Sequence, residues 1–130
     1  MKILLVCYNC AVKIGNVEKK TVYLGMSGGV DSAVSAYLLK MQGFEVVGVY
    51  MKNWSDDFGV TGDCPWEKDM IDVEAVCKLL DIEYRSYNFE KEYRDRVISN
   101  FFEQYELGLT PNPDILCNSE IKFDVFLNKC

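Results

Sequence analysis

The first half of the chain alternates between β-prone and helical patterns. Residues 21 to 24 form a short β-prone run, and residues 45 to 51 form a nearly continuous β-branched and apolar run, typical of a buried parallel strand. Gly43, just before the second run, is a natural end for a helix. The apolar positions that recur at helical spacing between the two runs are Ala33, Val34, Tyr37, Leu38 and Met41. These residues predict a βαβ unit, whose right-handed crossover places the first loop at the carboxyl edge of the sheet.

The same pattern continues along the chain after a surface loop at residues 52 to 65. Residues 66 to 80 predict a second helix, residues 82 to 89 a third strand, and residues 91 to 107 a long helix. The long helix carries an aromatic stripe at four-residue steps, which predicts core packing rather than a stacking platform: Tyr93, Val97, Phe101 and Tyr105. Three successive βα units predict an α/β fold with a doubly wound, mostly parallel sheet.

The last part of the chain places a cysteine near a helix start. Residues 110 to 114 break the periodicity, because two prolines around Asn112 hold the backbone extended. Residues 118 to 128 are again helical in pattern, so Cys117 is predicted at or just before a helix N-terminus. A thiol there can have its pKa lowered by the helix dipole, which raises its thiolate fraction. A buried structural cysteine is the alternative interpretation.

Residues 1 to 20 are predicted to be an N-terminal extension or an extra strand, ahead of a domain covering residues 21 to 130. Residues 2 to 6 look like a strand, but this run is too short for the core of a secretory signal. Cys7 and Cys10 form a lone Cys-x-x-Cys. A zinc site would need a second pair of ligands at suitable spacing, and the other four cysteines are isolated in the sequence.

Composition excludes several classes of function. The chain has 130 residues, 49% of them hydrophobic, which predicts a globular domain. It has no histidine, which excludes Ser-His and Cys-His dyads, and its net charge of −6 argues against a general nucleic-acid-binding surface. No apolar stretch approaches the roughly 18 residues of a membrane span, so we expect no membrane partner. The six cysteines, beside the nucleotide-type loop described next, favour a reducing, cytoplasmic location.

Candidate chemistry is concentrated in residues 25 to 32, Gly-Met-Ser-Gly-Gly-Val-Asp-Ser, between the first strand and the first helix. Adjacent glycines allow a positive φ and a close approach to an anion, and the amides at the helix start attract phosphate. Ser27 and Ser32 add hydroxyl donors, and Asp31 is explained if it holds Mg²⁺. A simple turn is the alternative for the glycines alone. The Walker pattern and the three-glycine dinucleotide fingerprint are both absent.

This loop resembles the Ser-Gly-Gly-x-Asp-Ser loop of the ATP-pyrophosphatase (PP-loop) superfamily, whose enzymes cleave ATP between the α and β phosphates and transfer AMP. Two further motifs follow in order: Met51-Lys52-Asn53-Trp54, and Asn112-Pro113-Asp114-Ile115-Leu116-Cys117-Asn118 followed by Glu120-Ile121-Lys122-Phe123. Together the three motifs resemble the tRNA-specific 2-thiouridylase family, the tRNA-uridine 2-sulfurtransferases. The resemblance runs from about Val22 to Phe126.

The resemblance implies an adenine nucleotide alpha hydrolase-like fold and the 2-thiolation of the wobble uridine of tRNA. In that reaction ATP adenylates the uridine 2-oxygen, and sulfur from a cysteine persulfide then replaces it. The implied cofactors are ATP and Mg²⁺, and the implied partners are tRNA and a persulfide sulfur donor protein. The implied ATP-binding residues are Gly25, Met26, Ser27, Gly28, Gly29, Val30, Asp31, Ser32 and Met51.

The resemblance further implies that Cys117 is the catalytic nucleophile, with Asp114 as a second catalytic residue. Asn112, Pro113 and Asp114 would contact the target base. The persulfide-carrying cysteine, the later strands and the tRNA-gripping domains of the family lie beyond the matching region. Leu109 and Ser119 stand where basic residues are expected, which weakens the expected RNA contact.

We therefore expect an N-terminal fragment, truncated at its C-terminus and incomplete for turnover. One alternative is a nucleotide-binding remnant without activity. The other is a PP-loop synthetase that passes ammonia to an adenylated carbonyl, which would share the loop of residues 27 to 32 and would not need Cys117.

Overall fold

Four strands form one sheet in the order β1-β2-β3-β4 in the computed structural model, which describes residues 6–14, 17–54 and 66–130. The strands β2 (Val17–Met26), β3 (Glu45–Lys52) and β4 (Glu83–Asn88) run parallel. β1 (Val6–Ile14) pairs antiparallel with the outer edge of β2. The parallel part therefore follows the predicted βαβαβ order, with one antiparallel strand added.

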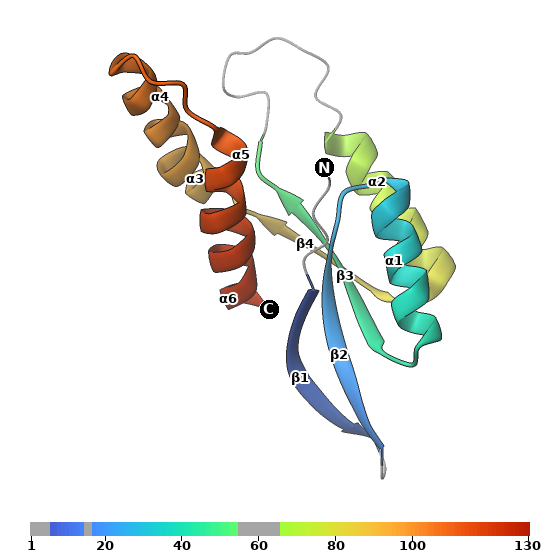
Figure 1. Cartoon of the computed structure of the whole chain (residues 1–130). Coiled ribbons are helices and arrows are strands. Elements are labelled where there is room, and N and C mark those ends of the chain that lie inside the picture. Colours follow the sequence, from blue (N-terminus) through green and yellow to red (C-terminus); the bar gives the residue numbers. More distant parts are fainter. Residues whose placement is uncertain (1–5, 15–16, 55–65) are drawn as a thin grey trace.

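Helices cover both faces of this sheet (Figure 1). On the first face lie α1 (Val30–Met41) and α2 (Trp66–Leu80). On the second face lie two helical segments. One consists of α3 (Glu90–Tyr93), η2 (Arg94–Ile98) and α4 (Ser99–Glu106), and the other of α5 (Pro113–Leu116), η3 (Cys117–Phe126) and α6 (Leu127–Lys129). This arrangement confirms the predicted doubly wound α/β fold. Among the described residues, none of these helices combines the length and apolar character needed to cross a bilayer.

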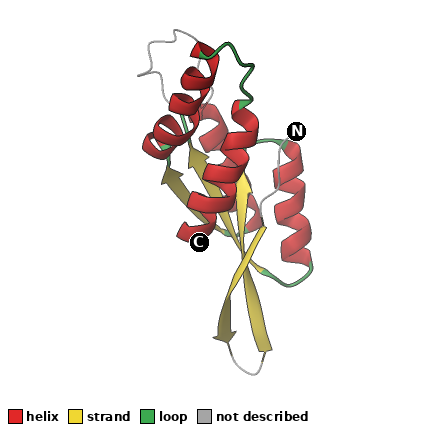
Figure 2. Cartoon of the chain, turned by 60° about the vertical axis from the view of Figure 1, so that its left-hand side comes forward, coloured by secondary structure: helices red, strands yellow, loops and turns green. Residues whose placement is uncertain are grey.

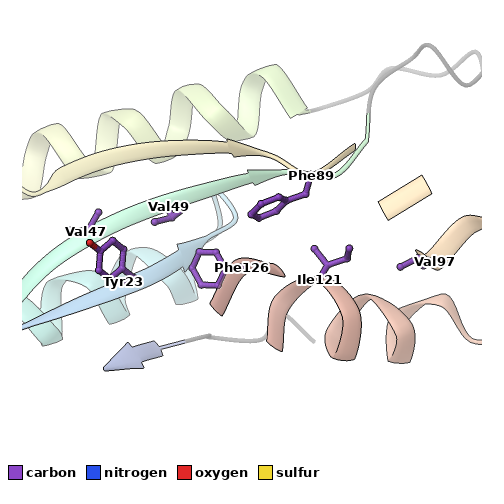
Figure 3. Close-up of a cluster of buried hydrophobic side chains, with 7 residues drawn as sticks. All are labelled: Tyr23, Val47, Val49, Phe89, Val97, Ile121 and Phe126. Carbon is purple, nitrogen blue, oxygen red and sulfur yellow. The ribbon is translucent and has the colours of Figure 1, made fainter. Parts of the chain in front are cut away.

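Each face of the sheet has its own buried cluster of side chains. The second-face cluster joins β2, β3 and the end of β4 to both helical segments, and Figure 3 shows its members: Tyr23, Val47, Val49, Phe89, Val97, Ile121 and Phe126. The first-face cluster lies under α1 and α2 and consists of Leu24, Met26, Ala36, Val46, Tyr50, Val73 and Cys77. Alternate residues of β3 enter opposite clusters, which is the period-two pattern of a strand buried on both faces.

The helical spacing predicted α1 correctly, but most of its apolar positions do not face the sheet. Val34, Tyr37, Leu38 and Met41 are about half exposed or more, whereas the buried residues of α1 are Ser32 and Ala36. The expected aromatic core stripe is also wrong at its outer end. Val97 is fully buried and Tyr93 packs against the second-face cluster, but Tyr105 is 66% exposed. The spacing of apolar residues thus predicted the helices correctly. It did not predict which of their residues the sheet covers.

The N-terminal segment supplies an edge strand, one of the two forms expected for it. Cys7 and Cys10 both lie in β1, opposite Tyr23 and Thr21, with an irregularity in the register between them. The predicted strand at residues 2 to 6 falls largely on residues outside the described part. β2 begins at Val17 rather than at the predicted residue 21, and the hairpin of β1 and β2 projects beyond the helices (Figure 2).

Gly48 in the middle of β3 allows α2 to pack closely on the sheet. A methyl group at this position would lie 2.5 Å from the Cys77 sulfur and 2.8 Å from the Met26 sulfur. The two sulfur atoms already touch at 3.8 Å. We expect Gly48→Ala to lower the free energy of unfolding by about 1–3 kcal/mol, measured by urea denaturation.

A second substitution separates this steric effect from a general loss of stability. Cys77→Ala removes the nearer sulfur, so the Gly48→Ala, Cys77→Ala double variant is expected to be more stable than the sum of the two single changes by about 1 kcal/mol. Strictly additive effects would contradict the close packing described for Gly48.

Candidate functional site

The loop between β2 and α1 has a backbone suited to an anion. Gly28 adopts a φ of 72°, the left-handed region that favours glycine. Gly29 is the N-cap of α1 and makes no side-chain capping hydrogen bond. The amides of the first turn of α1 therefore face the loop without a cap, and the helix dipole adds positive potential at the same place.

The two serines of the loop have different roles. The Ser32 hydroxyl is buried, donates to the Gly29 carbonyl oxygen at 2.9 Å and accepts from the Ser27 amide at 3.4 Å. It therefore holds the loop in shape in this structure, and its expected contact with a phosphate stays a prediction. The Ser27 hydroxyl oxygen is buried and has no hydrogen-bond partner within the described residues. A buried hydroxyl in this state is suited to a bound ligand.

Helix α2 fixes the position of the glycine turn. A methyl group at Gly28 would lie 3.0 Å from the Asp69 carbonyl oxygen and 3.1 Å from its Cα. Because these are backbone atoms in the first turns of a helix, they cannot move aside as a flexible side chain would. Asp31, the expected magnesium ligand, lies exposed in the first turn of α1.

Met51, near the carboxyl end of β3, reaches across to the end of β2. Its terminal methyl carbon would be 3.0 Å from a methyl group at Gly25, so the absence of a side chain at Gly25 makes room for it. Met51 also packs against the second-face cluster. The structure therefore brings one of the predicted nucleotide residues into contact with the strand that leads into the loop.

Lys52 and Trp66 brace the same edge of the sheet, a feature that sequence reasoning missed. The Lys52 ammonium lies 3.1 Å from a Glu90 carboxylate oxygen and 4.0 Å from the centre of the Trp66 ring. The Tyr50 hydroxyl donates to the Trp66 carbonyl oxygen at 3.2 Å. These contacts tie the end of β3 to the starts of α2 and α3. The motif at residues 51 to 54 was the sequence signal, but only Met51 was assigned a role.

The motif at residues 112 to 114 begins a helix, contrary to the prediction that the last helix starts at residue 118. Asn112 is the N-cap of α5, and its side-chain oxygen accepts from the Asp114 amide at 3.0 Å. Pro113 occupies the first helical turn, where its missing N–H costs nothing and its fixed φ suits a helix. Asn112 and Asp114 are exposed, so both side chains are accessible to a ligand.

Cys117 consequently lies one turn inside the helix rather than at its start. Its side chain is half-buried and packs against the second-face cluster, as Leu116 and Tyr93 also do. Burial raises the pKa of the Cys117 thiol, and nearby Asp114 raises it further, while Lys122 lowers it. The expected lowering of the thiol pKa by the helix dipole is therefore wrong, because Cys117 lies inside the helix and burial is the largest influence on its thiol.

The predicted site residues thus fall into two groups at the carboxyl edge of the parallel strands. The glycine loop leads into α1 on the first face, and residues 112 to 117 begin the last helical segment on the second face (Figure 1). Met51 links the two groups, because its side chain lies against Gly25 and packs against the same buried cluster as Cys117.

Comparison with models of known protein families shows which family this chain belongs to. The model of the tRNA methyl transferase HUP domain family matches residues 20–130. The chain belongs to this family. The match begins after β1, so that strand lies outside the HUP domain as the family defines it.

Two relatives of this HUP-domain chain are named tRNA-specific 2-thiouridylase MnmA. The protein of Methylobacillus flagellatus is 59% identical over 110 residues, which are 85% of this chain and 30% of the relative. That of Exiguobacterium sibiricum is 55% identical over 111 residues, 85% of this chain and 29% of the relative. The chain therefore spans about 30% of the length of these relatives. Among solved structures, the NH3-dependent NAD synthetase of Campylobacter jejuni aligns with a TM-score of 0.49 and 24% identity, over 81% of this chain and 39% of that chain.

Proposed function

We propose that this chain is the nucleotide-handling part of a cytoplasmic tRNA-uridine 2-sulfurtransferase. In this proposal ATP activates the 2-oxygen of the wobble uridine, and sulfur from a cysteine persulfide replaces that oxygen. The observation that carries the proposal is the position of Met51, which lies against Gly25 at the end of the strand leading into the glycine loop and packs against the same buried cluster as Cys117. Nucleotide and thiol chemistry can then serve one substrate.

The loop residues fit the phosphates of ATP. The uncapped amides at the start of α1 and the unpartnered Ser27 hydroxyl supply donors, and Gly28 lets the backbone approach closely. Within the described residues no group of three or more acidic or cysteine side chains is arranged to hold a metal ion. Asp31, exposed in the first turn of α1, would hold Mg²⁺ together with phosphate oxygens, a common arrangement for this ion.

The chemistry explains why both sites are needed. The carbonyl oxygen of uracil is a very poor leaving group, and transfer of AMP from ATP converts it into a good one. The outer sulfur of a persulfide on a second cysteine attacks the activated carbon, and AMP leaves with the original oxygen. The Cys117 thiolate attacks the inner sulfur of that persulfide, so the S–S bond breaks, a disulfide forms between the two cysteines, and the outer sulfur stays on the uridine. Asn112, Pro113 and Asp114, at the exposed start of the same helix, hold the target base, and Asp114 lies close enough to influence the thiol.

The relatives are named 2-thiouridylases, whereas the family description names a methyl transferase. The 2-thiouridylase name agrees better with the proposed reaction. A PP-loop and a nucleophilic cysteine are the parts that adenylation and sulfur transfer require. We propose tRNA as the substrate and a persulfide-carrying protein as the sulfur source, because the relatives named 2-thiouridylase share 55–59% of the aligned residues. The net charge of −6 indicates that most of the tRNA contact comes from residues outside this chain.

A chimera tests the proposal. Residues 20 to 130 replace the matching part of the Methylobacillus flagellatus relative, and the chimera is expressed in a bacterial strain lacking its own 2-thiouridylase. We expect mass spectrometry of digested tRNA to detect 2-thiouridine. A chimera that is folded and binds tRNA but leaves the nucleoside absent would reject the proposal. The unmodified 130-residue chain is expected to bind ATP without tRNA-dependent release of pyrophosphate.

A further inference from the structure

The helix that carries Cys117 is wound differently from an ordinary α-helix. From Cys117 to Phe126 the segment η3 is a π-helix, in which hydrogen bonds join residues five apart. In an α-helix, which advances about 100° per residue, position i+5 lies about 140° around the axis from position i. The wider π turn brings position i+5 back toward position i. Lys122, five residues after Cys117, is thereby brought to the same side of the helix.

A hydrogen bond holds the Lys122 side chain in place. Its ammonium group donates to the Asn118 side-chain oxygen at 2.9 Å, and the Lys122 side chain is only partly exposed. Asn118 follows Cys117 directly, so the bond keeps the ammonium near the first turn of η3. A lysine held in this way loses less rotamer freedom when it faces a neighbouring anion.

The other groups that face Cys117 within the described residues disfavour its thiolate or have no charge. Asp114, on α5, adds a negative charge. Tyr93, on α3, has its own pKa raised, first by burial, so near neutral pH it is an uncharged phenol. Burial itself disfavours the charged thiol. Lys122 supplies the charge that opposes these effects.

We propose that Lys122 is a positioning residue that stabilises the thiolate of Cys117, held toward it by the π-helical register of η3 and by Asn118. Only the reaction assigned to this thiolate rests on the proposed function; the effect of Lys122 on the thiol does not. The inference itself is that one ammonium group, five residues away, offsets part of the penalty that burial and Asp114 place on the thiolate.

The test measures the reactivity of Cys117 in the chain without ATP or tRNA. The rate of alkylation by iodoacetamide is followed between pH 6.5 and 10 by mass spectrometry of the peptide that contains Cys117. For K122M we expect the midpoint of the pH–rate profile to rise by about half to one pH unit, so that the rate at pH 7.5 falls about three- to tenfold, because thiolate is the reacting species. For K122R we expect a midpoint close to that of the unmodified chain.

Matched variants separate this effect from a change in fold or net charge. K78M removes an exposed lysine from α2, on the first face, and is expected to leave the pH–rate profile of Cys117 unchanged. N118A keeps the Lys122 charge and the Cys117 thiol but releases the ammonium group from its hydrogen bond, so we expect a smaller upward shift of the midpoint. If K122M loses its far-ultraviolet circular dichroism signal, N118A becomes the variant that tests the inference. Profiles of K122M and N118A that coincide with that of the unmodified chain would overturn the inference. Because no tRNA or nucleotide is present, that result would leave the sulfurtransferase proposal standing.

Discussion

Replacing Cys117 by serine is expected to abolish formation of 2-thiouridine by the chimera while leaving tRNA-dependent release of pyrophosphate within a few-fold of its normal rate. A hydroxyl is not ionised at neutral pH and cannot take the place of the thiolate. Loss of a catalytic nucleophile lowers turnover by at least about a thousandfold. Adenylation uses the glycine loop instead, so it should continue. Mass spectrometry of the nucleosides and a coupled pyrophosphate assay measure the two steps separately.

Cys130 provides the matched control, because its thiol is also half-buried and packs against the second-face cluster. We expect C130S to retain 2-thiouridine formation. Full activity of C117S would favour an amidating synthetase, which shares the loop of residues 27 to 32 and does not need the cysteine. Loss of pyrophosphate release along with thiolation would instead give Cys117 a role in folding.

The second large effect is expected at Gly28. Alanine at a φ of 72° costs about 1–2 kcal/mol, and its methyl group would meet the Asp69 backbone at 3.0 Å. The loop must shift, and the amides at the start of α1 then no longer converge on a phosphate. Each hydrogen bond to a charged group contributes about 1.5–3 kcal/mol, so losing two weakens ATP binding by at least about a hundredfold. Isothermal titration calorimetry of the 130-residue chain with ATP and Mg²⁺ measures this change.

Gly43 is a control with the same backbone requirement. Its φ is 87°, but a methyl group there meets nothing within 4 Å, and the residue lies at the opposite end of α1. G43A is expected to lose stability by about 1 kcal/mol and to bind ATP normally. Equal weakening of ATP binding in the two variants would mean that the effect of G28A is a loss of fold, not of the phosphate site.

The βαβ order and the glycine loop could be predicted because both depend on local chemistry. The β-branched run at residues 45 to 51 favours an extended strand, and the adjacent glycines at 28 and 29 permit the positive φ that Gly28 adopts in the turn. The face of α1 was not predictable in the same way. Close packing of α1 on the sheet favours the small residues Ser32 and Ala36, and periodicity alone does not report that distance.

The position of Cys117 was missed for a different reason. The sequence pattern around Pro113 predicts a break in the helix, although proline is favoured in the first helical turn after a capping asparagine such as Asn112. The one-turn error reversed the expected direction of the thiol pKa. The π winding of η3, which brings Lys122 round toward Cys117, has no sequence signature here, since it depends on how the whole helix packs against the sheet.

The antiparallel strand β1 has a consequence for how the sheet can be enlarged. It pairs with the outer edge of β2 from Val6 to Ile14, ahead of the residues that match the HUP domain. In the part of the sheet that the structure describes, the two borders are therefore β1 and β4, and the outer edge of β2 is covered. Any strand joining from a longer polypeptide must therefore pair with β4 or with β1, and it can reach β2 only by displacing β1.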